Sequence, residues 1–325
     1  MEEYKAYIPY GYQNVNEDDI KSVIDVLQSN FLTQGAVVPK FEGRVADYCQ
    51  AKYAIAVNSA TSALHVACLA LGVGDKDLVW TSATTFVASA NCALYCGADI
   101  DFIDIDRLTF NIDISALKNK LVESHKNNKL PKVIVVVHLC GQPCDMEALS
   151  KLSKEYGFRI IEDAAHAIGS KYKGKKTGAC HYSDITVFSF HPVKIITTAE
   201  GGMALTNNEV LAKKMRLLRS HGITRDESEM VNDPKGEWYY EQLMLGFNYR
   251  MTELQAALGF SQMDRIDDFV SKRHALADNY KKLLHHLPID LPKLDVDSYS
   301  SIHLYVIRLQ LNNIQLTHKE VFSKL

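Results

Sequence analysis

The sequence predicts an α/β fold with a mostly parallel central sheet, helices on both faces, and a smaller C-terminal α+β domain. Between Tyr53 and about Ser220, short β-rich runs alternate with helical patterns, which is the rhythm of successive βαβ units. The 325 residues are enough for one large domain and a smaller one. Ligands of parallel sheets bind at the carboxyl ends of the strands, so the residues that follow strands are the candidates for a site.

Each expected strand and helix is assigned from its own hydrophobic pattern. The predicted strands are Tyr53–Val57, Leu78–Thr81, Ile100–Ile105, Val133–His138, Arg159–Glu162 and Ile185–Phe190. The helical patterns among them are Thr61–Leu71, Phe86–Tyr95, Ile114–Leu121 and Met146–Tyr156. A long helical pattern runs from Met251 to His286, and His303–Leu311 predicts a strand of the smaller domain. We therefore expect a large domain with an N-terminal arm over residues 1–260, and a connecting helix with the start of the small domain over 261–325.

Composition narrows the class of protein. Hydrophobic residues make up 47% and charged residues 23% of the chain, as in ordinary globular proteins. A net charge of -3 argues against a nucleic-acid binder, which normally carries a basic face. The longest apolar runs are strand-sized, and the acidic start, Met1 to Tyr4, does not resemble a signal peptide. We expect a soluble, cytoplasmic protein without a membrane partner.

The seven cysteines are scattered through apolar segments. Two pairs, Cys92 with Cys96 and Cys140 with Cys144, share a C-x3-C spacing, but neither has the second clustered pair that a zinc site requires. Reduced and mostly buried thiols are therefore expected, and no metal is predicted.

Two segments at strand ends are suited to hold an anionic, heterocyclic ligand. Residues 58–63, Asn-Ser-Ala-Thr-Ser-Ala, follow a strand and open a helix, where free N–H groups and the helix dipole favour a phosphate. Taken alone, the same residues also fit a plain N-cap. The apolar strand before Asp163 ends in a carboxylate that could hold a protonated ring nitrogen, although a turn also favours Asp there.

A third strand, Val187–Phe190, leads to Lys194. A catalytic lysine must be partly unprotonated, and burial lowers its pKa, whereas most lysines are solvated surface charges. Directly behind it, Gly201 and Gly202 allow close backbone packing. A phosphate cradle, a strand-end Asp163 and a post-strand Lys194, in this order, meet the separate requirements of one cofactor, pyridoxal 5′-phosphate (PLP).

These segments resemble the DegT-type sugar aminotransferases, which have the fold-type I aminotransferase architecture. The resemblance is carried by Asp163-Ala-Ala-His-Ala-Ile-Gly169, Phe188-Ser-Phe-His-Pro-Val-Lys194, Ala199-Glu-Gly-Gly202, Leu32-Thr-Gln-Gly35, Thr85-Phe86, His138, Gly141-Gln-Pro143, Ser220-His-Gly222 and Asn248-Tyr-Arg-Met-Thr-Glu253. It covers nearly the whole chain. Within the family, the cradle and the Lys194 segment are most similar to the branch that aminates UDP-linked 4-keto-6-deoxy-hexoses for pseudaminic acid synthesis.

The resemblance implies a role for each matching residue. Lys194 would hold PLP as a Schiff base and move the proton at sugar C4, and Asp163 would pair with the ring nitrogen. His166 would contact the phenolic oxygen of the ring, and Phe86 would stack on its face. The phosphate would be held by Ala60, Thr61 and Ser189 of one subunit and by Asn248 of the other, which requires a homodimer with a shared active site.

The resemblance also suggests the substrates. The keto-sugar nucleotide would contact Tyr10, the segment Asn30, Phe31, Leu32 and Thr33, and the segment Ile302, His303, Leu304 and Tyr305. Glutamate is the amino donor expected from the family. The alternatives are an aminotransferase for another nucleotide keto-sugar, a PLP sugar dehydratase, in which histidine replaces the lysine, and a non-catalytic homologue. The presence of Lys194 argues against the dehydratase.

The C-terminal part of the chain carries one further expectation. Thr317 is typical of an N-cap, and a helix begins at His318 and runs to the last residue, Leu325. Small domains of this family continue with further strands and helices. We therefore expect a complete cofactor site and an incomplete small domain.

Overall fold

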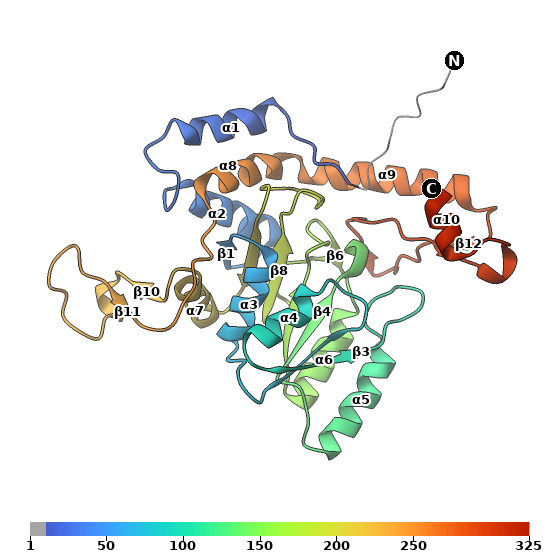
Figure 1. The fold of residues 1–325 in the computed structure, drawn as a ribbon, viewed down its shortest axis with the longest axis horizontal. Coiled ribbons are helices and arrows are strands. Elements are labelled where there is room, and N and C mark those ends of the chain that lie inside the picture. Colours follow the sequence, from blue (N-terminus) through green and yellow to red (C-terminus); the bar gives the residue numbers. More distant parts are fainter. Residues whose placement is uncertain (1–10, 325) are drawn as a thin grey trace.

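The computed structural model describes residues 11–324 and has a seven-stranded sheet at its centre (Figure 1). The strand order is β1-β9-β8-β5-β4-β2-β3. The strands are β1 Tyr53–Val57, β2 Leu78–Ser82, β3 Asp99–Ile103, β4 Val133–Val137, β5 Arg159–Asp163, β8 Ile185–Ser189 and β9 Gly202–Thr206. Only the pairings of β9 with β1 and β8 are antiparallel. The predicted mostly parallel α/β sheet is confirmed.

Helices cover both faces of the sheet, because buried strands present apolar side chains alternately to either side. On β4, Val133 and Val135 pack with α3, α4 and α7, whereas Ile134 and Val136 pack with α5 and α6. The helices α2 and α8 cover the other end of this second face, over β1, β9 and β8. These helices are α2 Val37–Cys49, α3 Ala60–Ala70, α4 Ala88–Tyr95, α5 Ile114–Lys126, α6 Met146–Tyr156, α7 Glu209–Arg219 and α8 Glu253–Gln262.

A helical rod runs along one side of the molecule (Figure 1). It consists of α8, the short 3-10 helix Met263–Arg265 and α9 Ile266–Leu284, so the long predicted helix is confirmed with one irregular turn. The N-terminal helix α1, Glu17–Leu27, packs on α8, where its buried Asp19 accepts hydrogen bonds from Ser261 and Gln262 and pairs with Arg265. The predicted domain boundary after residue 260 falls inside α8 and stays a prediction.

The remaining elements are short. The strands β10 Ile223–Thr224 and β11 Glu241–Gln242 enclose a loop that projects away from the sheet (Figure 1). The other small strands are β6 Lys171–Tyr172, β7 Lys175–Lys176, β12 Ile289–Asp290, β13 Ser298–Tyr299 and β14 Arg308–Leu309. Short 3-10 turns lie at Leu139–Gly141, Glu227–Glu229 and Leu311–Asn313. Over residues 11–324, none of the helices is both long and apolar enough to cross a bilayer.

Two predicted elements need correction. The expected strand His303–Leu311 is wrong, because only Arg308–Leu309 pairs, with β12. The amide groups of residues 301, 303 and 304 instead donate to the carbonyls of Gly141 and Cys140, so this stretch docks on a loop rather than on a strand. The helix expected from Phe86 begins only at Ala88. In contrast, α10 His318–Lys324 begins after Thr317, which forms reciprocal hydrogen bonds with Glu320.

Candidate active site

The register of the sheet brings the predicted segments to one edge. Gly202, the first residue of β9, lies opposite both Val57, the last residue of β1, and Ser189, the last residue of β8. Asp163, the last residue of β5, pairs with Val187 two residues before Ser189. The ends of β1, β5 and β8 and the start of β9 therefore share one edge, as expected for a site of this sheet class.

The N-terminus of α3 forms the cradle at this edge. Ser59 caps the helix by accepting a hydrogen bond from the Ser62 amide at 3.1 Å. The amides of Ala60 and Thr61 have no hydrogen-bond acceptor among the described residues, so they are available to an anion. A Cβ on Gly202 would lie 2.4 Å from the Ala60 nitrogen and 2.5 Å from the Ser59 carbonyl carbon. Only glycine therefore lets β9 pass behind the cradle.

Asp163 is buried, and each of its carboxylate oxygens accepts one hydrogen bond. Oδ2 accepts from the Ser89 hydroxyl at 2.5 Å, and Oδ1 accepts from the Ala165 amide at 3.1 Å. Ser89 lies on α4 and also contacts the Thr85 hydroxyl at 2.7 Å. Sequence reasoning missed Ser89, because nothing in the sequence marks it as a neighbour of a residue far along the chain.

Lys194 lies in the loop 190–201 that joins β8 to β9. Phe190 closes this loop, since its amide donates to the Gly201 carbonyl at 3.0 Å and its carbonyl accepts from the Thr198 amide at 2.9 Å. Burial lowers the pKa of Lys194, and the charge of Asp163 opposes that shift. A lysine with a lowered pKa is a better nucleophile and proton carrier at neutral pH.

Two imidazoles in contact with each other lie beside Lys194. The rings of His166 and His303 have centroids 4.4 Å apart at 38°. Burial, aided by the Lys194 charge, lowers the pKa of His166 to about 3, and burial with the charges of His166, Lys194 and Arg273 lowers that of His303 to about 2. His166 Nδ1 accepts the Cys140 amide at 3.3 Å, so the proton of the neutral ring is on Nε2, which can donate to a ligand.

The segment 300–305 is held in place by backbone contacts. The His303 amide donates to the Cys140 carbonyl at 2.9 Å, and Ser301 Oγ donates to the His166 carbonyl at 2.7 Å. Arg273 Nη1 donates to the carbonyls of Ile302 and His303 at 3.3 and 3.1 Å. Of the predicted substrate residues, His303 therefore lies beside His166 and Lys194.

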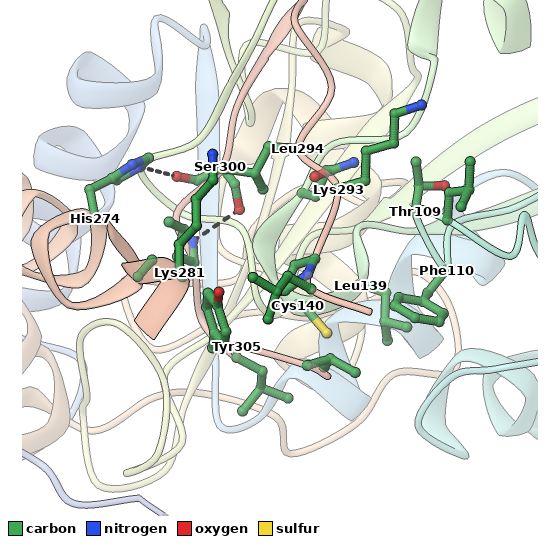
Figure 2. Close-up of a pocket in the computed structure, with 18 of the residues that line it drawn as sticks. Thr109, Phe110, Leu139, Cys140, His274, Lys281, Lys293, Leu294, Ser300 and Tyr305 are labelled. Atoms are coloured by element: carbon green, nitrogen blue, oxygen red, sulfur yellow. Dashed lines mark hydrogen bonds between the residues drawn. The ribbon is translucent and has the colours of Figure 1, made fainter. Parts of the chain in front are cut away.

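Two cavities lie along α9. The larger, about 380 Å³, lies between α9 and the loops at Phe110 and Cys140, and Ile302, Leu304 and Tyr305 line it (Figure 2). The smaller, about 270 Å³, lies between the Lys194 loop and α9 and contains Lys194 itself. We take the smaller cavity as the one nearest the chemistry, because the larger one does not reach Lys194.

The other predicted residues that the structure describes lie at the surface. Phe86 is 70% exposed and lies just before α4. Asn248 is exposed, and its backbone lies beside the cradle of its own chain, where its carbonyl accepts from the Asn58 side chain at 3.5 Å. The exposed segment Asn30–Thr33 lies near the start of α8, where the Leu32 carbonyl accepts the Glu253 amide, and lines neither cavity. Tyr10 lies outside the described residues.

A second buried polar group lies next to the site, on the opposite face of β5. Glu162 accepts hydrogen bonds from His138 Nε2 at 2.7 Å, from Thr186 at 2.9 Å and from Ser183. His138 Nδ1 accepts the Cys144 amide at 3.1 Å. The network contacts no cavity that contains Lys194, so His138, a motif residue of the sequence, supports the sheet rather than the site.

The profile of the DegT/DnrJ/EryC1/StrS aminotransferase family matches residues 13–325. The chain belongs to this family. It is an aminotransferase, and the convergence of Lys194, Asp163 and the cradle at one sheet edge is the arrangement on which the DegT resemblance rested.

Three similar proteins have sequence identities between 31% and 41%. The UDP-4-amino-4,6-dideoxy-N-acetyl-beta-L-altrosamine transaminase of Campylobacter jejuni is 41% identical over 303 residues, 93% of this chain and 76% of the relative. Helicobacter pylori PseC, an aminotransferase involved in the biosynthesis of pseudoaminic acid, is 33% identical with a TM-score of 0.83, covering 97% of this chain and 79% of its own. A putative sugar aminotransferase from Streptococcus pneumoniae, solved in its PLP form, is 31% identical with a TM-score of 0.82, covering 94% and 78%.

Proposed function

We propose that this aminotransferase converts a UDP-linked 4-keto-6-deoxy-hexose to its 4-amino sugar, in a pathway of the pseudaminic acid type, with glutamate as amino donor. The protein is a PLP-dependent nucleotide-sugar transaminase, and PLP is its cofactor. The observation that carries the proposal is the meeting of a lysine of lowered pKa, a buried carboxylate and two free amides at one sheet edge. The choice of sugar is supported by the identity with the altrosamine transaminase.

The residues present fit the cofactor. The lack of a side chain at Gly202 lets β9 lie directly against the cradle, and the amides of Ala60 and Thr61 with the Ser189 hydroxyl would hold the phosphate. Asp163, fixed by Ser89, would hold the ring nitrogen, and His166 Nε2 would donate to the phenolic oxygen. When bound, PLP supplies an electron sink for the bonding electrons at the reacting carbon.

The residues of the chain supply the rest of the reaction. Lys194 Nζ would hold the cofactor between turnovers. It would also deliver a proton to sugar C4 as the amino group is transferred to that carbon. Phe86 would cover the ring, because its exposed side chain follows β2 at the same edge. The segments Asn30–Thr33 and Ile302–Tyr305, with Tyr10, would contact the nucleotide sugar.

The active form is proposed to be a homodimer in the cytoplasm. Large apolar side chains are exposed on the projecting loop, including Val231 at 84% and Trp238 at 76%, and exposed apolar groups of this size are typical of an interface. Asn248 would reach the phosphate of the partner subunit. All seven cysteines are free, as expected in a reducing compartment.

A substrate panel tests the proposal directly. The purified protein is incubated with PLP, glutamate and UDP-, GDP- and TDP-linked keto-sugars, and the amino-sugar nucleotides are identified by mass spectrometry. We expect the UDP-linked 4-keto-6-deoxy-hexose to be aminated fastest, and the Lys194→Ala variant to give no product while remaining folded. Faster amination of a GDP- or TDP-linked sugar would exclude the proposed substrate.

A further inference from the structure

The smaller cavity carries more positive charge than the proposed chemistry uses. Three basic residues line it, Lys194, Lys272 and Arg273, and its described lining contains no Asp or Glu. Lys272 forms an ion pair with Asp268 at 2.7 Å, and Lys194 is assigned to the cofactor. Arg273 has no carboxylate within ion-pair distance among residues 11–324.

Arg273 is held in a fixed orientation. Its Nη1 group is anchored by the carbonyls of Ile302 and His303, whereas Nε and Nη2 make no hydrogen bond with the described residues. Those two nitrogens form the edge of the guanidinium that binds a carboxylate through two parallel hydrogen bonds. Burial lowers the pKa of Arg273, so this charge is partly desolvated, and an incoming anion would compensate it.

The position of Arg273 relates it to the reaction. It shares the cavity with Lys194, and its charge acts on His303, whose ring contacts that of His166. An anion bound at Arg273 would therefore lie beside the cofactor, which receives the amino nitrogen of the donor. The volume of about 270 Å³ is below the roughly 300–1,000 Å³ of pockets for drug-sized ligands, which suits an amino acid better than a nucleotide sugar.

We propose that this cavity binds the amino donor and that Arg273 pairs with one of its carboxylates through Nε and Nη2. The donor is thereby an amino acid whose carboxylate lies toward α9 while its amino group faces Lys194. This inference rests on the proposed function and adds the residue that recognises the donor.

Ligand binding to the PLP-loaded protein tests the inference. Glutarate is an unreactive dicarboxylate probe, and its Kd is measured by calorimetry beside that of UDP. We expect Arg273→Gln to weaken glutarate binding at least tenfold and to leave the Kd of UDP unchanged. Arg273→Lys keeps the positive charge but loses the planar guanidinium, and it should weaken glutarate binding about threefold or more. This variant replaces Arg273→Gln in the test if the Gln variant does not fold.

The matched control is Arg44→Gln, which removes an exposed arginine paired with Asp264 outside both cavities and should change neither constant. A parallel readout is the glutamate concentration that half-saturates amination of the bound cofactor, followed by absorbance, which should rise with the same variants. Unchanged glutarate and glutamate constants in both Arg273 variants, or a loss of UDP binding alone, would overturn the inference. If the protein aminates a keto-sugar and the Arg273 variants use the donor as well as the wild type does, the inference is rejected and the proposed function stands. If no donor supports amination, the proposed function itself is rejected.

Discussion

At the residue scale, the geometry of Asp163 depends on a serine from another helix. The Ser89 hydroxyl donates to Oδ2 and itself lies beside Thr85, so the carboxylate is fixed before any ligand arrives. A carboxylate that is already oriented stabilises a charge on a ring nitrogen without reorganisation during the reaction. Ser89 is thus a positioning residue, and Asp163 would contact the cofactor.

We predict that Asp163→Asn slows turnover by about a hundredfold or more while the cofactor stays bound, because an amide cannot stabilise the pyridinium charge. Ser89→Ala should slow it by about tenfold, since one hydrogen bond to a charged group is lost. Steady-state rates with saturating substrates and the absorbance of bound PLP measure both effects. Ser22→Ala, on α1, is the control and should have neither effect. Near-normal turnover of Asp163→Asn would show that Asp163 does not act on the ring.

The buried Glu162 predicts a pH dependence of stability. Burial alone would raise the pKa of Glu162, but the hydrogen bonds that it accepts from His138, Ser183 and Thr186 lower it overall. A lowered pKa in the folded state contributes stability above the unfolded pKa of about 4.3, and this contribution is lost as pH falls toward the folded value.

We therefore expect Glu162→Gln to reduce the free energy of unfolding by about 3 kcal/mol at pH 7 and by less at pH 4, because the hydrogen bonds to the carboxylate are weakened. Urea unfolding of both proteins at the two pH values measures the difference. A gap that stays constant with pH would mean that Glu162 is not ionised in the folded protein.

At the element scale, the backbone at the start of α3 packs directly against the backbone at the start of β9. The backbone atoms of Ser59 and Ala60 occupy the space that a side chain at residue 202 would need. Another such contact between elements lies at α2, whose N-cap Ala36 has no capping side chain. There the buried Glu253 of α8 accepts the amides of Gly35 and Val37 at 3.0 and 2.6 Å and replaces the missing cap.

Gly202→Ala should displace the first turn of α3 and raise the Kd of PLP at least tenfold, because the new Cβ meets backbone atoms that cannot rotate away. The Kd is measured by fluorescence titration of the apo protein. Gly43→Ala is the matched control: no atom lies within 4 Å of its Cβ, and inside α2 it should stabilise the protein by about 0.5–1 kcal/mol. Equal PLP affinity for both variants would contradict the close fit at the cradle.

At the scale of the whole molecule, the proposed dimer has a site made from two chains. The backbone of Asn248 lies at the cradle of its own chain, through Asn58, but its side chain is exposed. The activity of mixed dimers therefore distinguishes two roles of the Asn248 side chain: the proposed contact with the cofactor phosphate in the partner subunit, and a contact in the site of its own chain.

Mixing inactive Lys194→Ala and Asn248→Ala chains should restore about a quarter of wild-type activity after random subunit exchange, because half the dimers then hold one intact site of two. Exchange is verified with chains that carry different tags. If Asn248 serves its own chain, every site in the mixture stays defective and no rescue appears.

The sequence predicts those parts of the site that local pattern determines. Asp163, Lys194 and the cradle follow strands directly, so their edge of the sheet could be inferred from the βαβ rhythm. The contacts of Ser89, Arg273 and Glu253 join residues far apart in the chain, and no local pattern encodes them. The expected strand at His303–Leu311 is wrong for the same reason, because residues 304–306 line a cavity and the amides of His303 and Leu304 dock on the Cys140 carbonyl instead of pairing with a strand.

The antiparallel direction of β9 has a consequence for how the site assembles during folding. Because β8 and β9 are neighbours in both sequence and space, the segment that carries Lys194 is a hairpin whose contacts are local. The cradle, in contrast, needs the Asn58 amide to meet the Tyr249 carbonyl across most of the chain. Local contacts form at a lower cost in loop-closure entropy than contacts between segments far apart in the chain. We therefore expect the lysine loop to form before the phosphate cradle during folding, so that a partly folded chain would carry an ordered lysine loop but no formed cradle.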